Sequence, residues 1–104
     1  MIQAKLDNNV RYLQIAFNYD LSTVWQTLPR IPQSDRILIE AGTPFIKLEG
    51  MDGIRAIRKR WHGHIVADMK VTDGALGEVE MAHRAGATAI TVLGNAPSES
   101  IDIF

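Results

Sequence analysis

Two carboxylates and an ammonium group occur within six residues in the second half of the chain. Asp68 ends the apolar run Ile65–Asp68, and Lys70 and Asp73 follow it. Charges gathered where a buried strand ends can bind and polarise an anionic substrate. The alternative is a solvated loop in which Asp68 caps a turn and Lys70 is its exposed partner. The spacing alone leaves both interpretations open.

A further carboxylate, Glu40, ends the preceding apolar run, Ile37–Glu40. If the two runs are neighbouring parallel strands, Glu40 and Asp68 lie side by side at one edge of the sheet. Two carboxylates suit Mg²⁺, which takes few protein ligands and fills its shell with water and substrate oxygens. Lys70 would then lie against a developing enolate oxygen or a substrate phosphate. Asp73 begins a helical pattern, where a carboxylate is favoured as N-cap whatever its function.

The histidines and most of the basic residues favour structural or surface roles. His62 and His64 form a His-x-His pair at the N-terminal end of a predicted strand, the end that usually serves stability. His83 falls among polar residues of a predicted helix and is expected at the surface. A basic run is spread around another helix and predicts a solvated face; its members are Arg55, Arg58, Lys59 and Arg60.

Composition narrows the function classes. The chain has 104 residues, enough for one small domain, with 46% hydrophobic and 22% charged residues. A net charge of −1 gives no electrostatic case for binding nucleic acid or an anionic membrane. The absence of cysteine excludes disulfides, a thiolate nucleophile and cysteine-ligated metals. No signal-peptide or membrane-spanning pattern is present, so a cytoplasmic location is expected.

Four nearly continuous apolar runs predict the strands of a parallel sheet that is buried on both faces. These runs are Tyr12–Phe17, Ile37–Glu40, Ile65–Asp68 and Ala89–Leu93. Helical patterns separate them at Leu21–Leu28, Met51–Trp61 and Asp73–Ala85. Asp20 or Ser22 is the expected N-cap of the first helix, and Gly86 is the expected C-cap of the third.

The runs begin 24 to 28 residues apart, as right-handed βαβ units require. Residues 94–100 are typical of the loop and first turn of a fourth helix, which Phe104 cuts short. We therefore expect one α/β domain, residues 1–104, with four βα units of which the last is truncated. Such a chain can form a small doubly wound sheet or half of a (β/α)8 TIM barrel. No Gly-x-Gly-x-x-Gly motif or P-loop follows a strand, which argues against nucleotide binding.

Three segments resemble one enzyme family. The segment 39–50 (IEAGTPFIKLEG) is similar to the second strand and loop of 3-hexulose-6-phosphate synthases and 3-keto-L-gulonate-6-phosphate decarboxylases. The segment 68–74 (DMKVTDG) matches the Asp-x-Lys-x-x-Asp signature of the wider orotidine 5′-monophosphate decarboxylase superfamily, and residues 78–94 continue the likeness. The resemblance implies the N-terminal half of a ribulose-phosphate-binding barrel that acts on a phosphorylated sugar as a homodimer.

The resemblance also implies a role for each site residue. Glu40 and Asp68 would hold Mg²⁺, Lys70 would stabilise an enediolate, and Asp73 would reach into the partner's site. Glu40 favours the sugar-phosphate branch, because the nucleotide decarboxylase carries a Lys in its second-strand loop. Where the family's first strand usually ends in Asp, this chain has Asn18, which keeps a carbonyl acceptor at this substrate-binding position but loses the charge. Asp20, two residues on, is not expected to take its place.

The chain also ends after the fourth strand, whereas the family's phosphate loops belong to the seventh and eighth strands and its acid/base histidine to the sixth. A half-barrel leaves strand edges and a sheet face open, so a homodimer, a higher homo-oligomer or a partner that supplies the missing half is expected.

The favoured function is that of an Mg²⁺-dependent lyase joining formaldehyde to ribulose 5-phosphate, impaired by the truncation. The alternatives are a sugar-phosphate or orotidine-phosphate decarboxylase, and a non-catalytic truncated or engineered half-barrel that dimerises.

Overall fold

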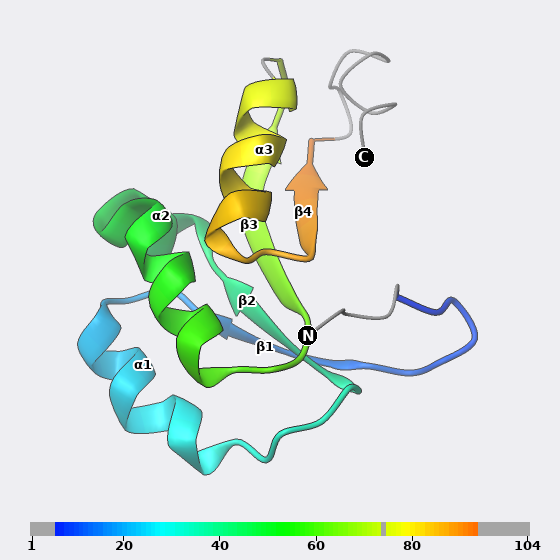
Figure 1. Cartoon of the computed structure of the whole chain (residues 1–104), viewed down its shortest axis with the longest axis vertical. Helices are drawn as coiled ribbons and strands as arrows, with labels where there is room; N and C mark the ends of the chain where they lie inside the picture. Colours follow the sequence, from blue (N-terminus) through cyan, green and yellow to red (C-terminus); the bar gives the residue numbers. More distant parts are fainter. Residues whose placement is uncertain (1–5, 74, 94–104) are drawn as a thin grey trace.

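The computed structural model describes residues 6–73 and 75–93, and within them four parallel strands alternate with helices (Figure 1). The strands are β1 (Leu13–Phe17), β2 (Ile37–Ala41), β3 (Ile65–Val71) and β4 (Ala89–Val92). The helices are α1 (Leu21–Thr27), the 3₁₀ turn η1 (Leu28–Arg30), α2 (Thr43–Arg60) and α3 (Ala75–Ala85). The expected βαβαβαβ order is confirmed. The loop and helical turn expected at residues 94–100 lie outside the described residues.

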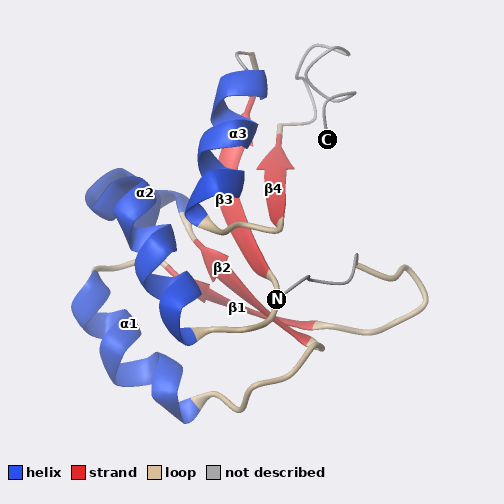
Figure 2. Cartoon of the chain, in the orientation of Figure 1, coloured by secondary structure: helices blue, strands red, loops and turns tan. Residues whose placement is uncertain are grey.

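The strands lie in the sheet in the order of the sequence, β1-β2-β3-β4, and every neighbouring pair is parallel. All three helices cover the same face (Figure 2), since one apolar cluster joins them to the strands. A doubly wound sheet would place helices on both faces. This arrangement is that of half a (β/α)8 barrel, and of the two predicted architectures it is the one that forms.

The core lies between the sheet and the helices. Alternate strand residues point into it, because successive side chains of a strand face opposite sides. Its fully buried members include Val24 of α1, Ile54 and Ile57 of α2, and Ile39 and Ile65 of the central strands. The strand residues between these core positions face the opposite side of the sheet, which carries none of the helices that the structure describes. In the part of the chain that the structure describes, no helix is long and apolar enough to cross a membrane.

Two helix starts differ from the expected ones. The second helix begins at Thr43 rather than Met51, because Pro44 falls in its first turn, where proline is tolerated. A backbone break at Gly50 (φ 66°, ψ −160°) separates this first part from the predicted part. The third helix begins at Ala75, so Asp73 lies ahead of it in the loop. The first helix is capped as predicted, by Asp20, whose side chain accepts from the Thr23 amide at 3.1 Å.

The third strand is longer than predicted. It continues past Asp68 to Val71, and its pairing with β4 loses register between Ala67 and Val71. Within this irregular stretch Lys70 adopts a φ of 50°. Positive φ in a residue other than glycine costs on the order of 1–3 kcal/mol and persists only where surrounding contacts impose it. The end of β3 is therefore held by contacts that the strand ladder does not supply.

At the opposite end of the sheet, Arg58 hydrogen-bonds to the loops that precede β3 and β4. Its guanidinium donates to the carbonyls of Gly86, Trp61 and Gly63 at 2.7 to 3.0 Å, so that it joins the ends of α2 and α3 to the start of β3. Partial burial lowers the pKa of Arg58. Gly86 has a φ of 119° and closes α3 as predicted, with the Ala87 amide donating to Ala82 at 2.9 Å.

We expect Gly86→Ala to destabilise the fold by roughly 1–3 kcal/mol, because alanine disfavours this backbone conformation. Its Cβ would also lie 2.7 Å from the Arg58 Cγ. The matched control is Gly77→Ala in α3, where a Cβ meets nothing within 4 Å and helix propensity predicts a gain of about 0.5–1 kcal/mol. Urea unfolding of both variants measures the difference, and equal stability of the two would contradict this account of Gly86.

Candidate functional site

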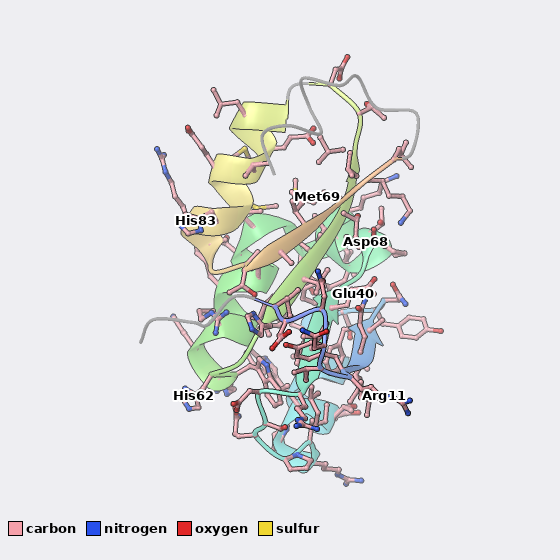
Figure 3. All side chains as sticks on the ribbon, turned by 90° about the vertical axis from the view of Figure 1, so that its right-hand side faces the viewer. Arg11, Glu40, His62, Asp68, Met69 and His83 are labelled. Atoms are coloured by element: carbon pink, nitrogen blue, oxygen red, sulfur yellow. The ribbon has the colours of Figure 1, made fainter. Side chains whose placement is uncertain are left out.

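Three of the charged residues predicted from the sequence, Glu40, Asp68 and Lys70, lie toward the C-terminal ends of β2 and β3. Glu40 pairs with Val66 across the β2–β3 ladder, so Asp68 lies two residues further along the neighbouring strand. Figure 3 looks onto the face of the sheet opposite the described helices and shows Glu40 and Asp68 on it, from adjacent strands. The strand register therefore places the two residues on one face of adjacent strands, and a shared site for their carboxylates stays a prediction.

Asp68 and Lys70 make a direct ion pair. The Lys70 Nζ lies 2.7 Å from the Asp68 Oδ2 and also donates to the Thr43 hydroxyl at 2.7 Å. The other carboxylate oxygen, Oδ1, accepts from the Thr91 hydroxyl at 2.6 Å. The Asp68 side chain is 19% exposed and that of Lys70 50%, so the carboxylate is sheltered while the ammonium reaches solvent. Lys70 is therefore a specific partner of Asp68 rather than a freely solvated side chain.

The surroundings of Asp68 favour its ionised form. Partial burial by itself would raise the pKa of this carboxyl. The hydrogen bonds from Lys70 and Thr91 and the charge of the ammonium outweigh burial, and they hold the Asp68 pKa below its ordinary value. The site therefore presents Asp68 as a carboxylate at neutral pH, in an ion pair with Lys70.

Glu40 is oriented from β1. It accepts a hydrogen bond from the Gln14 Nε2 through Oε1 and is partly exposed. Glu40 and Asp68 together offer oxygen ligands only, from two carboxylates on one open face, and this donor set fits a hard cation such as Mg²⁺. Among the described residues, no group of three or more histidine, cysteine, aspartate or glutamate side chains is arranged to hold a metal. A cation here would thus depend on water and substrate oxygens.

The hydrogen bonds that the described residues make around Asp68 and Lys70 do not include Asn18 or Asp73. Asn18 follows β1, and its side chain packs so closely over Gly42 that a Cβ there would lie 1.8 Å from the Asn18 Oδ1. Asp20 is committed to capping α1, so it does not replace the acid that Asn18 lacks. Asp73 is exposed in the loop between β3 and α3, outside the hydrogen bonds that join Asp68, Lys70 and the threonines.

The histidines are placed at the other end of the sheet or on its outer surface. His64 is 5% exposed, lies 3.0 Å from the Thr88 hydroxyl through Nδ1, and stacks edge-on with Tyr12. Burial, with the charge of Arg58, lowers the His64 pKa. His62 is exposed at the same end, and His83 is exposed on α3 (Figure 3).

Sequence reasoning missed three members of the site. Thr43, Thr91 and Gln14 hold the charged groups, yet none of them was singled out as a site residue. Thr43 stands next to Pro44 in a segment expected to be a loop, and Gln14 and Thr91 are ordinary polar residues of strands. The available signal was alternation along the strands, which places Gln14 on the face of Glu40 and Thr91 on that of Asp68.

We expect Lys70→Met to weaken the acid dependence of stability. The pKa of Asp68 is lower in the folded state than in the unfolded state, where it is about 3.9. Ionised Asp68 therefore adds to the free energy of unfolding above the unfolded-state pKa, and this stabilisation is lost as pH falls through the folded-state pKa. Because Lys70 is half exposed, the effect should stay below about 1 kcal/mol. Urea unfolding between pH 7 and pH 3 in EDTA measures it, with Lys59→Met as control. An unchanged pH profile in Lys70→Met would show that the pair does not set the Asp68 pKa.

Comparison with known proteins extends the likeness over most of the chain. Residues 11–104 match the family model described as orotidine 5′-phosphate decarboxylase / HUMPS family. The bifunctional enzyme Fae/Hps of Methanoregula boonei is 45% identical over 93 residues, and that of Methanosarcina barkeri is 46% identical. Each alignment covers 88% of this chain and 24% of the relative, so the chain spans about a quarter of these relatives' length.

Solved structures agree on the fold. The 3-hexulose-6-phosphate synthase from Salmonella typhimurium superposes with a TM-score of 0.80 at 33% identity, covering 88% of this chain and 44% of that one. The 3-keto-L-gulonate-6-phosphate decarboxylase from Vibrio cholerae superposes with a TM-score of 0.72 at 30% identity, covering 88% and 43%. The chain therefore belongs to the orotidine 5′-phosphate decarboxylase / HUMPS family and folds as part of its barrel.

Proposed function

We propose that this chain supplies the metal-binding and oxyanion-binding part of a lyase of the 3-hexulose-6-phosphate synthase type. The observation that carries the proposal is the ion pair of Asp68 and Lys70 beside Glu40, at the sheet edge where barrel enzymes place their chemistry. The identity to Fae/Hps proteins and the fold match to a 3-hexulose-6-phosphate synthase support the same reaction.

In the proposed reaction, ribulose 5-phosphate loses a proton from carbon to give an enediolate. The enediolate carbon then attacks the formaldehyde carbon. A carbon–carbon bond forms as the C=O π bond of formaldehyde breaks, the ketone of the sugar is restored, and the formaldehyde oxygen takes up a proton. Lys70 would donate a hydrogen bond to the enediolate oxygen, where negative charge develops. Glu40 and Asp68 would hold Mg²⁺, which when bound polarises substrate oxygens. Asp73, exposed beyond β3, would orient substrate across a homodimer interface, and Asn18 would offer a neutral acceptor beside Gly42.

A second candidate is decarboxylation of a keto-gulonate phosphate, favoured by the match to the Vibrio cholerae decarboxylase. It would also pass through an enediolate, formed by loss of CO₂ instead of a proton, so the roles of Lys70 and the two carboxylates would be unchanged. Because the chain spans 44% of the synthase structure, turnover would depend on a second copy or on a partner that completes the barrel. Without either, the chain would be a binding scaffold that does not catalyse.

The direct test is an assay of the purified chain with ribulose 5-phosphate, formaldehyde and Mg²⁺. It should be run alone and mixed with a separately produced C-terminal half of a matched synthase. We expect hexulose phosphate to form in at least one of these, and Lys70→Ala or EDTA to abolish it. Lys59→Ala on α2 is the matched control and should leave the rate unchanged. No product from either preparation, with the protein shown to be folded, would overturn the proposed synthase activity.

Metal binding can be tested without turnover. At ten times the dissociation constant, Mg²⁺ should stabilise the fold by about 1.4 kcal/mol, which raises the Tm of a domain of this size by roughly 5–10 °C. Glu40→Gln and Asp68→Asn should each remove the rise. Asp52→Asn is the control, because Asp52 is exposed on α2 and its ion pair, among the residues that the structure describes, is with Arg55 in the same helix. A rise that persists in both site variants would place the cation elsewhere.

A further inference from the structure

The Thr43 hydroxyl joins the start of α2 to the end of β3. It donates to the Asp68 carbonyl at 2.5 Å and accepts from the Lys70 Nζ at 2.7 Å. The ladder between β2 and β3 ends one residue earlier, at the pair Ala41–Ala67. Thr43 therefore takes over from the ladder, and its single hydroxyl serves both the backbone of Asp68 and the side chain of Lys70.

Thr91 performs the corresponding task from β4. Its hydroxyl donates to the Asp68 Oδ1 at 2.6 Å and accepts from the Lys70 amide at 3.1 Å. The β3–β4 register runs from the pair Ala67–Ile90 to the pair Val71–Val92, so residues 68–70 of β3 face Thr91 alone. Thr91 thus spans the irregular stretch in which Lys70 has its positive φ.

Each of the two threonine hydroxyls both donates and accepts a hydrogen bond. Valine has the same shape as threonine but can make neither bond. An ammonium has three N–H donors. The Lys70 ammonium donates one hydrogen bond to the Asp68 carboxylate and one to the Thr43 hydroxyl. Within residues 6–73 and 75–93, these two bonds leave the third N–H of the ammonium available to an oxyanion on the open face. The flexible lysine stem is thereby restricted before any substrate arrives, which is how a positioned charge assists a transition state.

We infer that Thr43 and Thr91 are positioning residues, Thr43 for the ammonium of Lys70 and Thr91 for the carboxylate of Asp68 and the backbone of Lys70. Their effect on catalysis rests on the proposed function. Their effect on the geometry of Lys70 does not, and it can be measured in the absence of turnover and of metal.

The experiment compares Thr43→Val and Thr91→Val with Thr43→Ser and Thr91→Ser. In the assay, each valine variant should lower kcat by about 10–100-fold with a smaller change in KM, as expected when a catalytic group is misplaced. The serine variants keep the hydroxyl and should recover most of the lost rate. A valine variant with wild-type kcat, or a serine variant as impaired as its valine counterpart, would overturn the catalytic part of the inference.

The second readout is NMR of the ¹⁵N-labelled chain in EDTA. Thr43→Val should speed exchange of the Lys70 ammonium protons with water, and Thr91→Val should speed exchange of the Lys70 amide. Thr88→Val is the control, because the Thr88 hydroxyl bonds His64 and Ile65 at the opposite end of the sheet. It should leave both Lys70 signals unchanged, even if it lowers stability.

The two readouts separate the possible failures. Wild-type protein without turnover, but with the predicted exchange pattern, would overturn the proposed function and support the positioning geometry. Unchanged Lys70 exchange in both valine variants, or an equal change in Thr88→Val, would overturn the positioning role. If Thr43→Val does not fold, Thr43→Ala measures the same loss of the hydroxyl without the branched side chain.

Discussion

The regular pairing of β3 with β4 is interrupted between Ala67 and Val71. The side chains of Asp68, Lys70 and Thr91, which lie in this irregular stretch, belong to the candidate site. A regular strand would pair its backbone with both neighbours and leave Asp68 and Lys70 as ordinary surface side chains. Here Lys70 has a φ of 50°, and two threonine hydroxyls from flanking elements bond the stretch. The irregular end of β3 thus brings the carboxylate, the ammonium and both threonines together at one point. The relative positions of Asp68 and Lys70 follow from this break in the β3–β4 register.

The energetics of this cluster point to function rather than to stability. An ion pair with one partner half exposed is worth about 1 kcal/mol or less, whereas holding Lys70 at positive φ costs a comparable or larger amount. The core lies on the other face of the sheet, where aliphatic side chains are fully buried, and its packing offsets this energetic cost. Local strain that yields no stability and gathers opposite charges at the C-terminal edge of a parallel sheet is typical of a reacting site.

Much of the fold could be predicted from the sequence, because continuous apolar runs and their spacing report buried parallel strands directly. The residues that proved hardest were those whose partners are distant in sequence. Thr43-Pro44 was expected to be a loop, because the family resemblance places this segment in the loop after the second strand, and its position in the first turn of α2 is seen only in the structure. Asp68 and Lys70 could be identified because charge at a strand end is visible locally. Thr91, 23 residues from Asp68, is distinguished only by the register of two strands.

We propose that Glu40 and Asp68 form one cation site beside Lys70, on the face of the sheet opposite the described helices. The most direct test replaces Mg²⁺ with paramagnetic Mn²⁺ and follows the amide signals of the ¹⁵N-labelled chain by NMR. We expect substoichiometric Mn²⁺ to broaden selectively the signals of Glu40, Thr43 and Thr91, while those of Thr88 and His62 at the opposite end of the sheet stay sharp. Broadening centred on His62 or His83, or uniform weak broadening across the surface, would contradict this proposal.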